Sequence, residues 1–237
     1  DEVEPLRCRG RRWDQRERGT LDDSLGGFPL TAIDALASQA QLGDVVGFRE
    51  SVARVERHLR VDRDVSVSVF ETTIRVVGGL LASHGLLRDT NLGPILRGTE
   101  LPPHHLRALH SHTLEPAEVL ALDSPLPYND SLLHAAEKLG HRIVDAHSMS
   151  GTGLPYHLMQ LSGISISKGL EKEVETCTAA AGTAILELGA LTAWTGNVSF
   201  LDAAADAIHA LWTRRSHGTG LVGSTIDVKR GTWRSPH

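Results

Sequence analysis

The sequence SVSVFETTIRVVGGLLASHGLL, residues 66–87, decides the fold of this chain. It is long enough for about six helical turns, and Glu71 and Arg75 carry its only formal charges. Apolar residues at a 3-4-3-4 spacing form one face, which consists of Val67, Phe70, Ile74, Val77 and Leu81. Apolar residues also fill most of the opposite side, and a helix of this kind is covered by protein on both faces. The stretch therefore predicts one continuous, buried helix.

A narrow stripe on this helix carries Glu71, Arg75, Gly78 and Ala82. An exposed Glu–Arg pair one turn apart contributes only a few tenths of a kcal/mol. A buried pair costs several kcal/mol of desolvation per ion unless it is well satisfied. We therefore predict that Glu71 and Arg75 form the wall of a functional site. A membrane span is excluded, because charges and paired glycines interrupt the run well short of about 20 apolar residues.

The composition is that of a soluble globular protein with room for a core. The chain has 237 residues, of which 41% are hydrophobic and 22% charged, as in ordinary soluble domains. Its net charge of −5 argues against a nucleic-acid partner. The arginines near the start are interleaved with acidic residues, which favours a solvated loop over a basic recognition patch.

Cysteines and sequons bear on the cellular compartment. Cys8 and Cys177 are the only cysteines, so one disulfide and two free thiols fit equally well. Asn129 and Asn197 lie in Asn-x-Ser sequons, which favours a secretory compartment. The chain begins at Asp1 without an initiator methionine, signal peptide or targeting segment, and we expect a fragment or a processed form.

Further helices are predicted on both sides of the central stretch, at residues 30–42, 48–59, 130–147, 176–194 and 200–215. A hairpin with Arg230-Gly231 at its turn follows within residues 220–233. Residues 1–29 and 148–174 are predicted to be irregular. Six of the ten prolines fall in residues 88–127, which predicts a long, partly disordered insertion.

The insertion contains the sequence HHLRALHSH, with His104, His105, His110 and His112. No carboxylate or cysteine completes this set at a spacing typical of metal ligands. The pattern favours a solvated loop, and we predict no metal site in this sequence.

The helices alternate in character along the chain. Nearly uncharged helices with one acid, namely Asp34, Glu71 or Glu187, alternate with amphipathic helices rich in surface charge. Glu187 shares its face with small residues, as Glu71 does. This alternation predicts an all-α, two-layer ring of helix hairpins whose acids point to a common centre. A stack of helical repeats is less favoured, because the sequence has no internal repeat of fixed period.

At this level the sequence resembles a known family. The motif SVFETTIRVVGGLLASH is similar to the signature of the class I α-mannosidases, family 47 of the glycoside hydrolases. DEVEPLRCRGR, DDSLGGFPLTAIDAL, TGLPY, ETCTAAAGTAILELGALTAWTG and GLVGSTIDVKRGTW resemble, in the same order, its branch of ER degradation-enhancing α-mannosidase-like proteins. The resemblance touches every segment except residues 88–127 and 157–173.

The resemblance implies the first half of an (α/α)₇ barrel within one catalytic domain over residues 1–237. It implies hydrolysis of α-1,2-linked mannose from N-glycans of misfolded glycoproteins in the ER lumen, with inversion and bound Ca²⁺. Glu71 of the FE-x-x-IR motif would be the general acid, and Arg75, Asp34 and Glu187 would bind the sugar. The implied partners are high-mannose N-glycans and a lumenal oxidoreductase.

Departures from the family pattern leave a second hypothesis open. The family barrel is about twice this length, and the motifs with the base candidate and the calcium ligand lie beyond residue 237, so we expect the isolated chain to be inactive. Residues 37–39 and 157–160 also differ from the family near the expected sugar site. The alternative is a non-catalytic, lectin-like module of ER quality control that binds glycans or clients.

Overall fold

The computed structural model describes residues 2–4, 6, 8–11, 27–100, 125–163 and 174–235. Within them, helices dominate and the strands are short, as the all-α prediction requires. The longer helices are α2 (Leu30–Gln41), α3 (Val45–His58), α5 (Gly78–Arg88), α9 (Ser131–Ser148), α11 (Ile185–Thr195) and α12 (Ser199–Thr213). Shorter helical segments are α4 (Val69–Glu71), the π-helix η2 (Thr72–Val77), α6 (Leu92–Arg97) and α10 (Thr178–Gly182).

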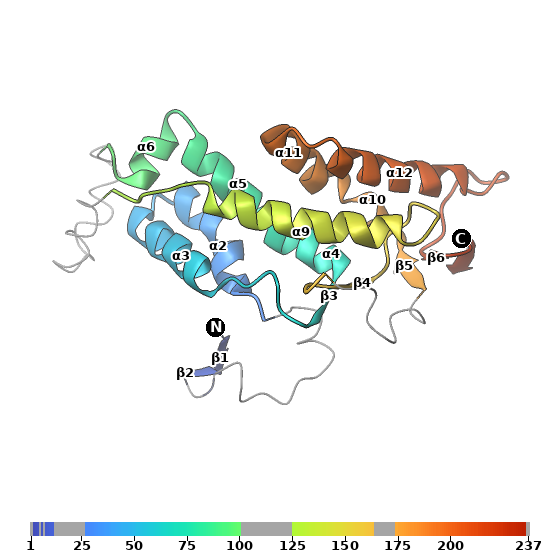
Figure 1. Cartoon of the computed structure of the whole chain (residues 1–237), viewed down its shortest axis with the longest axis horizontal. Coiled ribbons are helices and arrows are strands. Elements are labelled where there is room, and N and C mark those ends of the chain that lie inside the picture. The colour runs from blue at the N-terminus through green and yellow to red at the C-terminus, as the bar shows by residue number, and fades with distance from the viewer. Residues whose placement is uncertain are drawn as a thin grey trace.

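The helices form successive hairpins. Helix α2 packs against α3 and α5, helix α9 packs against α5 and α12, and α11 packs against α12. Figure 1 shows α9 running alongside the α4–η2–α5 segment, with the α2/α3 pair on one side and the α11/α12 pair on the other. The predicted hairpin arrangement is therefore present, with the nearly uncharged helices α2, α5 and α11 packed in succession.

The main core lies between these helices, because their apolar faces meet there. Its fully buried side chains include Phe48 of α3, Leu80 of α5, Leu139 of α9 and Phe200 of α12. A smaller apolar cluster lies under the C-terminal strands and contains Leu154 and Ile226. None of the helices in the described ranges combines the length and apolar character needed to cross a bilayer.

The central stretch is not one continuous helix, which corrects the prediction. Residues Ser66–Ser68 form strand β3, which pairs antiparallel with β4 (Leu158–Gln160). The helix begins after Ser68, whose hydroxyl accepts a hydrogen bond from the Glu71 amide at 3.2 Å. The π-helix η2 then precedes α5. The extended start results from strand pairing with a distant segment, which helical periodicity does not reveal.

The predicted insertion is also partly ordered. Helix α6 lies within residues 88–127, and its Leu96 is fully buried against the core. Pro94 stands in the first turn of α6, where proline is compatible with a helix because that amide has no intrahelical acceptor. The remainder of the insertion, residues 101–124, lies outside the described residues, and so do its four histidines.

Short strands replace parts of the segments that were predicted to be irregular or helical. Strands β1 (Glu2–Glu4) and β2 (Arg9–Arg11) pair antiparallel near the start. Strand β5 (Glu175–Cys177) takes the start of the predicted helix at residues 176–194. It joins β6 (Thr225–Asp227) and β7 (Trp233–Ser235) in a sheet of order β5-β6-β7. The predicted C-terminal hairpin is confirmed, with Gly231 in the left-handed conformation at its turn.

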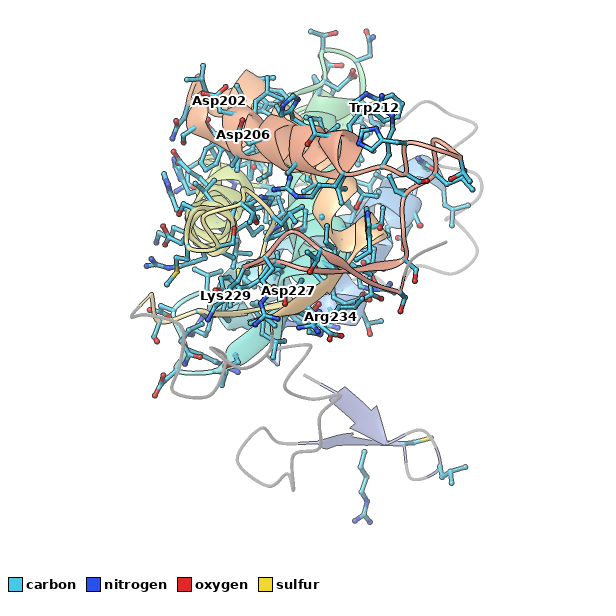
Figure 2. The ribbon with its side chains drawn as sticks, turned by 90° about the vertical axis from the view of Figure 1, so that its right-hand side faces the viewer. Asp202, Asp206, Trp212, Asp227, Lys229 and Arg234 are labelled. Atoms are coloured by element: carbon cyan, nitrogen blue, oxygen red, sulfur yellow. The ribbon has the colours of Figure 1, made fainter. Side chains whose placement is uncertain are left out.

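The turn of this hairpin is fixed by a buried carboxylate. Asp227 is 2% exposed and accepts hydrogen bonds from the amides of Lys229 and Arg230 at 3.0 and 2.9 Å. Arg234 donates to its second oxygen at 2.7 Å (Figure 2). These donors satisfy the charge, and together they hold the pKa of the Asp227 carboxyl below its usual value despite its burial. Asp227 is therefore part of the fold's framework.

Candidate active site

Glu71 stands at the junction between strand β3 and the helix that follows it. It is the last residue of α4, and the π-helix η2 begins directly after it. Its amide is held by the Ser68 hydroxyl, and Thr73 of the next turn bonds back to the Val69 carbonyl at 2.7 Å. The backbone that carries Glu71 is thereby fixed from both sides.

Arg75 joins two of the predicted acids. Its Nε donates to Glu71 Oε2 at 2.5 Å, and its guanidinium lies 3.7 Å from Asp34 Oδ2 on α2. The side chains of Asp34, Glu71 and Arg75 are 42%, 33% and 46% exposed. The prediction of a buried pair is therefore wrong in degree: the group lies on an open face of the described helices, and the carboxylates share one cation.

The charges around Asp34 oppose one another. Partial burial raises the pKa of the Asp34 carboxyl above its usual value, the Arg75 guanidinium lowers it, and the Glu71 carboxylate raises it. The net shift is upward, so burial and the neighbouring acid outweigh Arg75. Asp34 and Glu71 are thus two acids that compete for one guanidinium.

Glu187, on the first turn of α11, lies further along the same stripe. A Cβ placed on Gly78 would be 3.6 Å from Glu187 Oε1, and Gly78 follows Glu71 by seven residues, with η2 between them. Glu187 Oε2 is buried and has no hydrogen-bond partner among the described residues. Burial raises the pKa of the Glu187 carboxyl. The structure thus brings Asp34, Glu71 and Arg75 into contact, and it places Glu187 against Gly78 of the same helical run.

A shallow depression surrounds Glu187. Its volume is about 270 Å³, and it is lined by Gly78, Leu81, Ala82, Leu186, Glu187, Ala190 and Trp194. Trp194 was not predicted as a site residue, although its spacing of i+7 from Glu187 places it on the same helical face. It is 44% exposed, and its ring packs edge-on against the buried His84 with centroids 4.5 Å apart.

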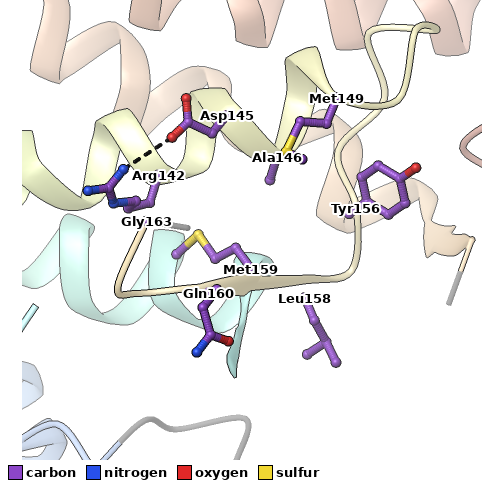
Figure 3. Close-up of a pocket in the computed structure, with 9 residues that line it drawn as sticks. All are labelled: Arg142, Asp145, Ala146, Met149, Tyr156, Leu158, Met159, Gln160 and Gly163. Atoms are coloured by element: carbon purple, nitrogen blue, oxygen red, sulfur yellow. Dashed lines mark hydrogen bonds and ion pairs between the residues drawn. The ribbon is translucent and has the colours of Figure 1, made fainter. Parts of the chain in front are cut away.

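A second cavity lies elsewhere, between α9 and β4. Its volume is about 190 Å³, and its lining includes Met149, Met159 and Tyr156 together with the Arg142–Asp145 ion pair (Figure 3). None of the four residues of the predicted acid cluster, which we define as Asp34, Glu71, Glu187 and the Arg75 that pairs with two of them, lines it. It therefore belongs to the outer packing of α9, and we do not assign it to the candidate active site.

The described residues do not offer a metal centre. No group of three or more His, Cys, Asp or Glu side chains in the described ranges could hold a metal ion. Ca²⁺ therefore stays an expectation from family resemblance, and no chemical step is derived from it.

The two cysteines are exposed and are not bonded to each other in the structure. Cys177 precedes α10, and its Sγ accepts a hydrogen bond from the Ala180 amide at 3.3 Å. The disulfide prediction stays a prediction. The sequon residues Asn129 and Asn197 both lie on turns that lead into helices, α9 and α12 respectively.

Comparison with known proteins identifies the family. The model of glycosyl hydrolase family 47 matches residues 1–237. The chain therefore belongs to this family. It also shares the fold of the α-1,2-mannosidase from Trichoderma reesei, an (α/α)₇ barrel, with a TM-score of 0.63 and 22% identity over 88% of this chain and 38% of that one.

Similar curated proteins carry names from ER quality control. Human ER degradation-enhancing alpha-mannosidase-like protein 3 is 38% identical over 98% of this chain. ER degradation-enhancing alpha-mannosidase-like protein 1 of Schizosaccharomyces pombe is 35% identical over the whole chain. Alpha-mannosidase I MNS4 of Arabidopsis thaliana is 34% identical over 98% of it. The chain spans 22%, 26% and 30% of the lengths of these relatives.

Proposed function

We propose that this chain supplies the acid side of the active site of an inverting α-1,2-mannosidase, which trims high-mannose N-glycans on misfolded glycoproteins. The observation that carries the proposal is the contact of Arg75 with both Glu71 and Asp34, with Glu187 against Gly78 of the same helical run. Carboxylates and a guanidinium on an exposed face are suited to the hydroxyl groups of a sugar. Family membership selects mannose among the possible sugars.

Glu71 acts as the general acid in this proposal. Arg75 holds Oε2, and no described side chain hydrogen-bonds to Oε1, so Oε1 can reach the glycosidic oxygen. The proton passes from Glu71 to the leaving oxygen as the bond from that oxygen to the anomeric carbon breaks. A water attacks the opposite face of the sugar and loses its proton to a base carboxylate about 6.5–9.5 Å from the acid. That base is not assigned to a residue of this chain.

Asp34 and Glu187 bind the sugar. Asp34 lies against Arg75, so it can accept a hydrogen bond from a sugar hydroxyl while it keeps the guanidinium in place. Glu187 has a buried oxygen without a partner in the described structure, and a substrate hydroxyl would satisfy it. A buried polar atom without a partner is costly, so this oxygen favours ligand binding.

The location and partners in this proposal follow from family resemblance and from the names of the relatives. They are the ER lumen, the glycans of misfolded glycoproteins and a lumenal oxidoreductase acting on Cys8 or Cys177. Ca²⁺ would serve as the cofactor with ligands outside residues 1–237.

Glycan binding without turnover is the second candidate. Gln160 stands where the family resemblance leads one to expect an asparagine. Its amide nitrogen donates to Asp64 at 2.6 Å, and its amide oxygen accepts from Ser66 at 2.8 Å. These bonds stabilise the β3–β4 pairing. A binding module needs the acid cluster but not this group.

The deciding experiment compares wild type with Glu71→Gln in the longest natural gene product that contains this chain. Mannose release from a high-mannose glycan is measured together with calorimetric binding of the same glycan. General acid catalysis is worth about 10²–10⁴-fold, so the variant should lose that much turnover and retain affinity. Full turnover in the variant would refute the role of Glu71. Binding without release by the wild type would establish the second candidate.

A further inference from the structure

The two sequons differ in their structural surroundings. Asn197 lies in the turn between α11 and α12, directly after Gly196, which ends α11 in the left-handed conformation. Asn129 lies before α9 on the segment that follows the insertion. Both asparagines are reachable from solvent, because Asn129 is exposed and Asn197 is partly exposed. Their neighbours decide which of them suits modification.

The backbone and one side-chain atom of Asn197 are fixed by local hydrogen bonds. Its carbonyl accepts from the Thr192 hydroxyl at 2.9 Å, and its amide donates to the Thr195 hydroxyl at 3.2 Å. Its Oδ1 accepts from both the amide and the hydroxyl of Ser199, at 3.1 and 2.8 Å. This side chain therefore helps to start α12.

The side-chain nitrogen Nδ2 of Asn197 has no role in this arrangement. Within the described residues, Nδ2 donates no hydrogen bond, and only Oδ1 takes part in the turn. N-glycosylation replaces a hydrogen on Nδ2 and leaves the amide oxygen as an acceptor. The modification therefore leaves the start of α12 intact. Exposed Val198, at 62%, and Trp194 flank the site, so the surface there is open to a bulky substituent.

The Asn129 sequon has an acidic middle residue. Asp130 adopts the left-handed conformation and pairs with Arg88, whose Nε donates to Oδ1 at 2.8 Å. Ser131, the third sequon residue, donates its hydroxyl to Glu56. An acid next to the acceptor asparagine repels an anionic glycosyl donor, since like charges at close range are unfavourable. Asn197 has the neutral Val198 in that position.

We propose that Asn197 carries an N-linked oligosaccharide and that Asn129 is modified to a much smaller extent. The inference rests on the lumenal location in the proposed function, but not on catalysis. The donor is an oligosaccharide linked to a lipid diphosphate. The Asn197 Nδ2 forms a bond to the anomeric carbon of the first sugar and loses one proton. The bond from that carbon to the diphosphate oxygen breaks, and the lipid diphosphate leaves with the electron pair.

This oligosaccharide would lie away from Glu71 and Arg75, although Trp194 also lines the depression around Glu187. Trp194, near the end of α11, contacts His84, and His84 follows Glu71 by thirteen residues on the same helical run. At about 1.5 Å per residue this corresponds to roughly 20 Å along the axis. The glycan on Asn197 therefore leaves the open face around Glu71 and Arg75 accessible to substrate.

The test is site mapping on the whole chain, expressed in a eukaryotic secretory pathway behind a cleavable leader. A reporter sequon at the C-terminus selects molecules that entered the lumen. These are treated with an amidase that removes N-glycans in ¹⁸O-water, which marks each formerly occupied asparagine as labelled aspartate. We expect label at Asn197, with little at Asn129, and the loss of one glycan mass in Asn197→Gln and Ser199→Ala.

Three further variants sharpen the result. Ser199→Thr keeps a hydroxyl at the third position and should retain the glycan, which separates loss of the sequon from loss of the turn. Val198→Asp gives Asn197 the middle residue of the other sequon and should lower its occupancy. Ser131→Ala should leave the mass unchanged. Reporter-positive molecules without label at Asn197, or with more label at Asn129, would overturn the proposal. Mannose release by the longer gene product that contains this chain reports on the proposed function independently.

Discussion

Arg75 and Glu71 are joined through Nε and Oε2 at 2.5 Å, although a π-helix rather than an α-helix separates them. The same guanidinium faces Asp34 of α2 at 3.7 Å. One cation therefore positions two acids that come from different helices. This arrangement makes Arg75 the residue through which the geometry of the site is most easily altered.

Replacing Arg75 with lysine should weaken the site while preserving its charge. Lysine lacks the planar fork that contacts two carboxylates at once, so Glu71 loses its orientation relative to Asp34. We expect glycan affinity to fall by roughly tenfold in calorimetric titration, because one charged hydrogen bond is worth about 1.5–3 kcal/mol and part of it is retained. The exposed Arg54→Lys on α3 is the control. Equal affinity for both variants would contradict the positioning role.

Glu187→Gln should stabilise the fold and weaken glycan binding. Burial raises the pKa of the Glu187 carboxyl, so the folded state holds its proton more tightly than the unfolded state does. Wild-type stability therefore falls as the pH rises above 4.5, the unfolded value. The glutamine variant avoids this loss, and its advantage in urea midpoint should be absent below pH 4.5 and grow above it.

The control for Glu187→Gln is Glu50→Gln, at an exposed position of α3, which should leave the urea midpoint unchanged at every pH. An advantage of Glu187→Gln that is independent of pH would show that burial of the charge is not its cause.

His147 should make the fold sensitive to acid. It is 2% exposed, its Nδ1 lies 3.2 Å from the Gly153 carbonyl, and burial lowers its pKa to about 4. The unfolded state binds a proton near pH 6.5, whereas the folded state does so only near 4. Stability is therefore complete above pH 6.5 and is lost between 6.5 and 4, by roughly 3 kcal/mol in total.

His147→Asn tests this prediction, because the asparagine amide can donate to Gly153 but does not titrate. Urea midpoints measured from pH 7.5 to 4.5 should fall less steeply for His147→Asn than for wild type. The exposed His209→Asn on α12 should follow the wild type. Identical slopes for all three proteins would exclude His147 as the source.

Gly140 of α9 lies against the side chains of the α11/α12 pair. A Cβ there would overlap Leu191 Cδ2 and lie 3.0 Å from Phe200 Cε1, and both side chains are fully buried. Gly140→Ala should therefore destabilise the fold by about 1–3 kcal/mol in urea unfolding. Gly189→Ala should instead stabilise it by about 0.5–1 kcal/mol, because its Cβ would meet Leu201 at an ordinary 3.7 Å. A loss of equal size at both positions would argue against the packing account.

The features that depend on local spacing could be predicted from the sequence. Glu71 and Arg75 are four residues apart, so their contact follows from a helical run whatever surrounds it. The lone acids on successive apolar helices likewise indicated a shared face. Their exposure could not be predicted in the same way, because it depends on which elements cover the stripe. The described helices leave it open.

Features set by distant partners could not be predicted in this way. Ser66–Ser68 is extended because Leu158–Gln160 pairs with it, and no helical pattern within the stretch contains that information. Only the alternation of serine and valine in SVSV hinted at a strand. The proline count likewise did not reveal helix α6, because a count does not distinguish the first turn of a helix, where Pro94 stands, from a disordered segment. Contact between Asp34 and Arg75 required the packing of α2.

The π-helix between Glu71 and Gly78 accommodates about one residue more than a regular α-helix would. The Gly78 amide bonds to the Thr73 carbonyl, five residues back, so this turn holds more residues than a turn of α-helix. Removing one residue from Thr72–Val77 would allow a regular helix to form, with better backbone geometry. The segments before and after it would keep nearly the same relative rotation, because a π-helical turn differs from an α-helical turn by about one residue. The extra residue is therefore taken up within Thr72–Val77 itself, and it does not change the direction in which Glu71 points relative to α5.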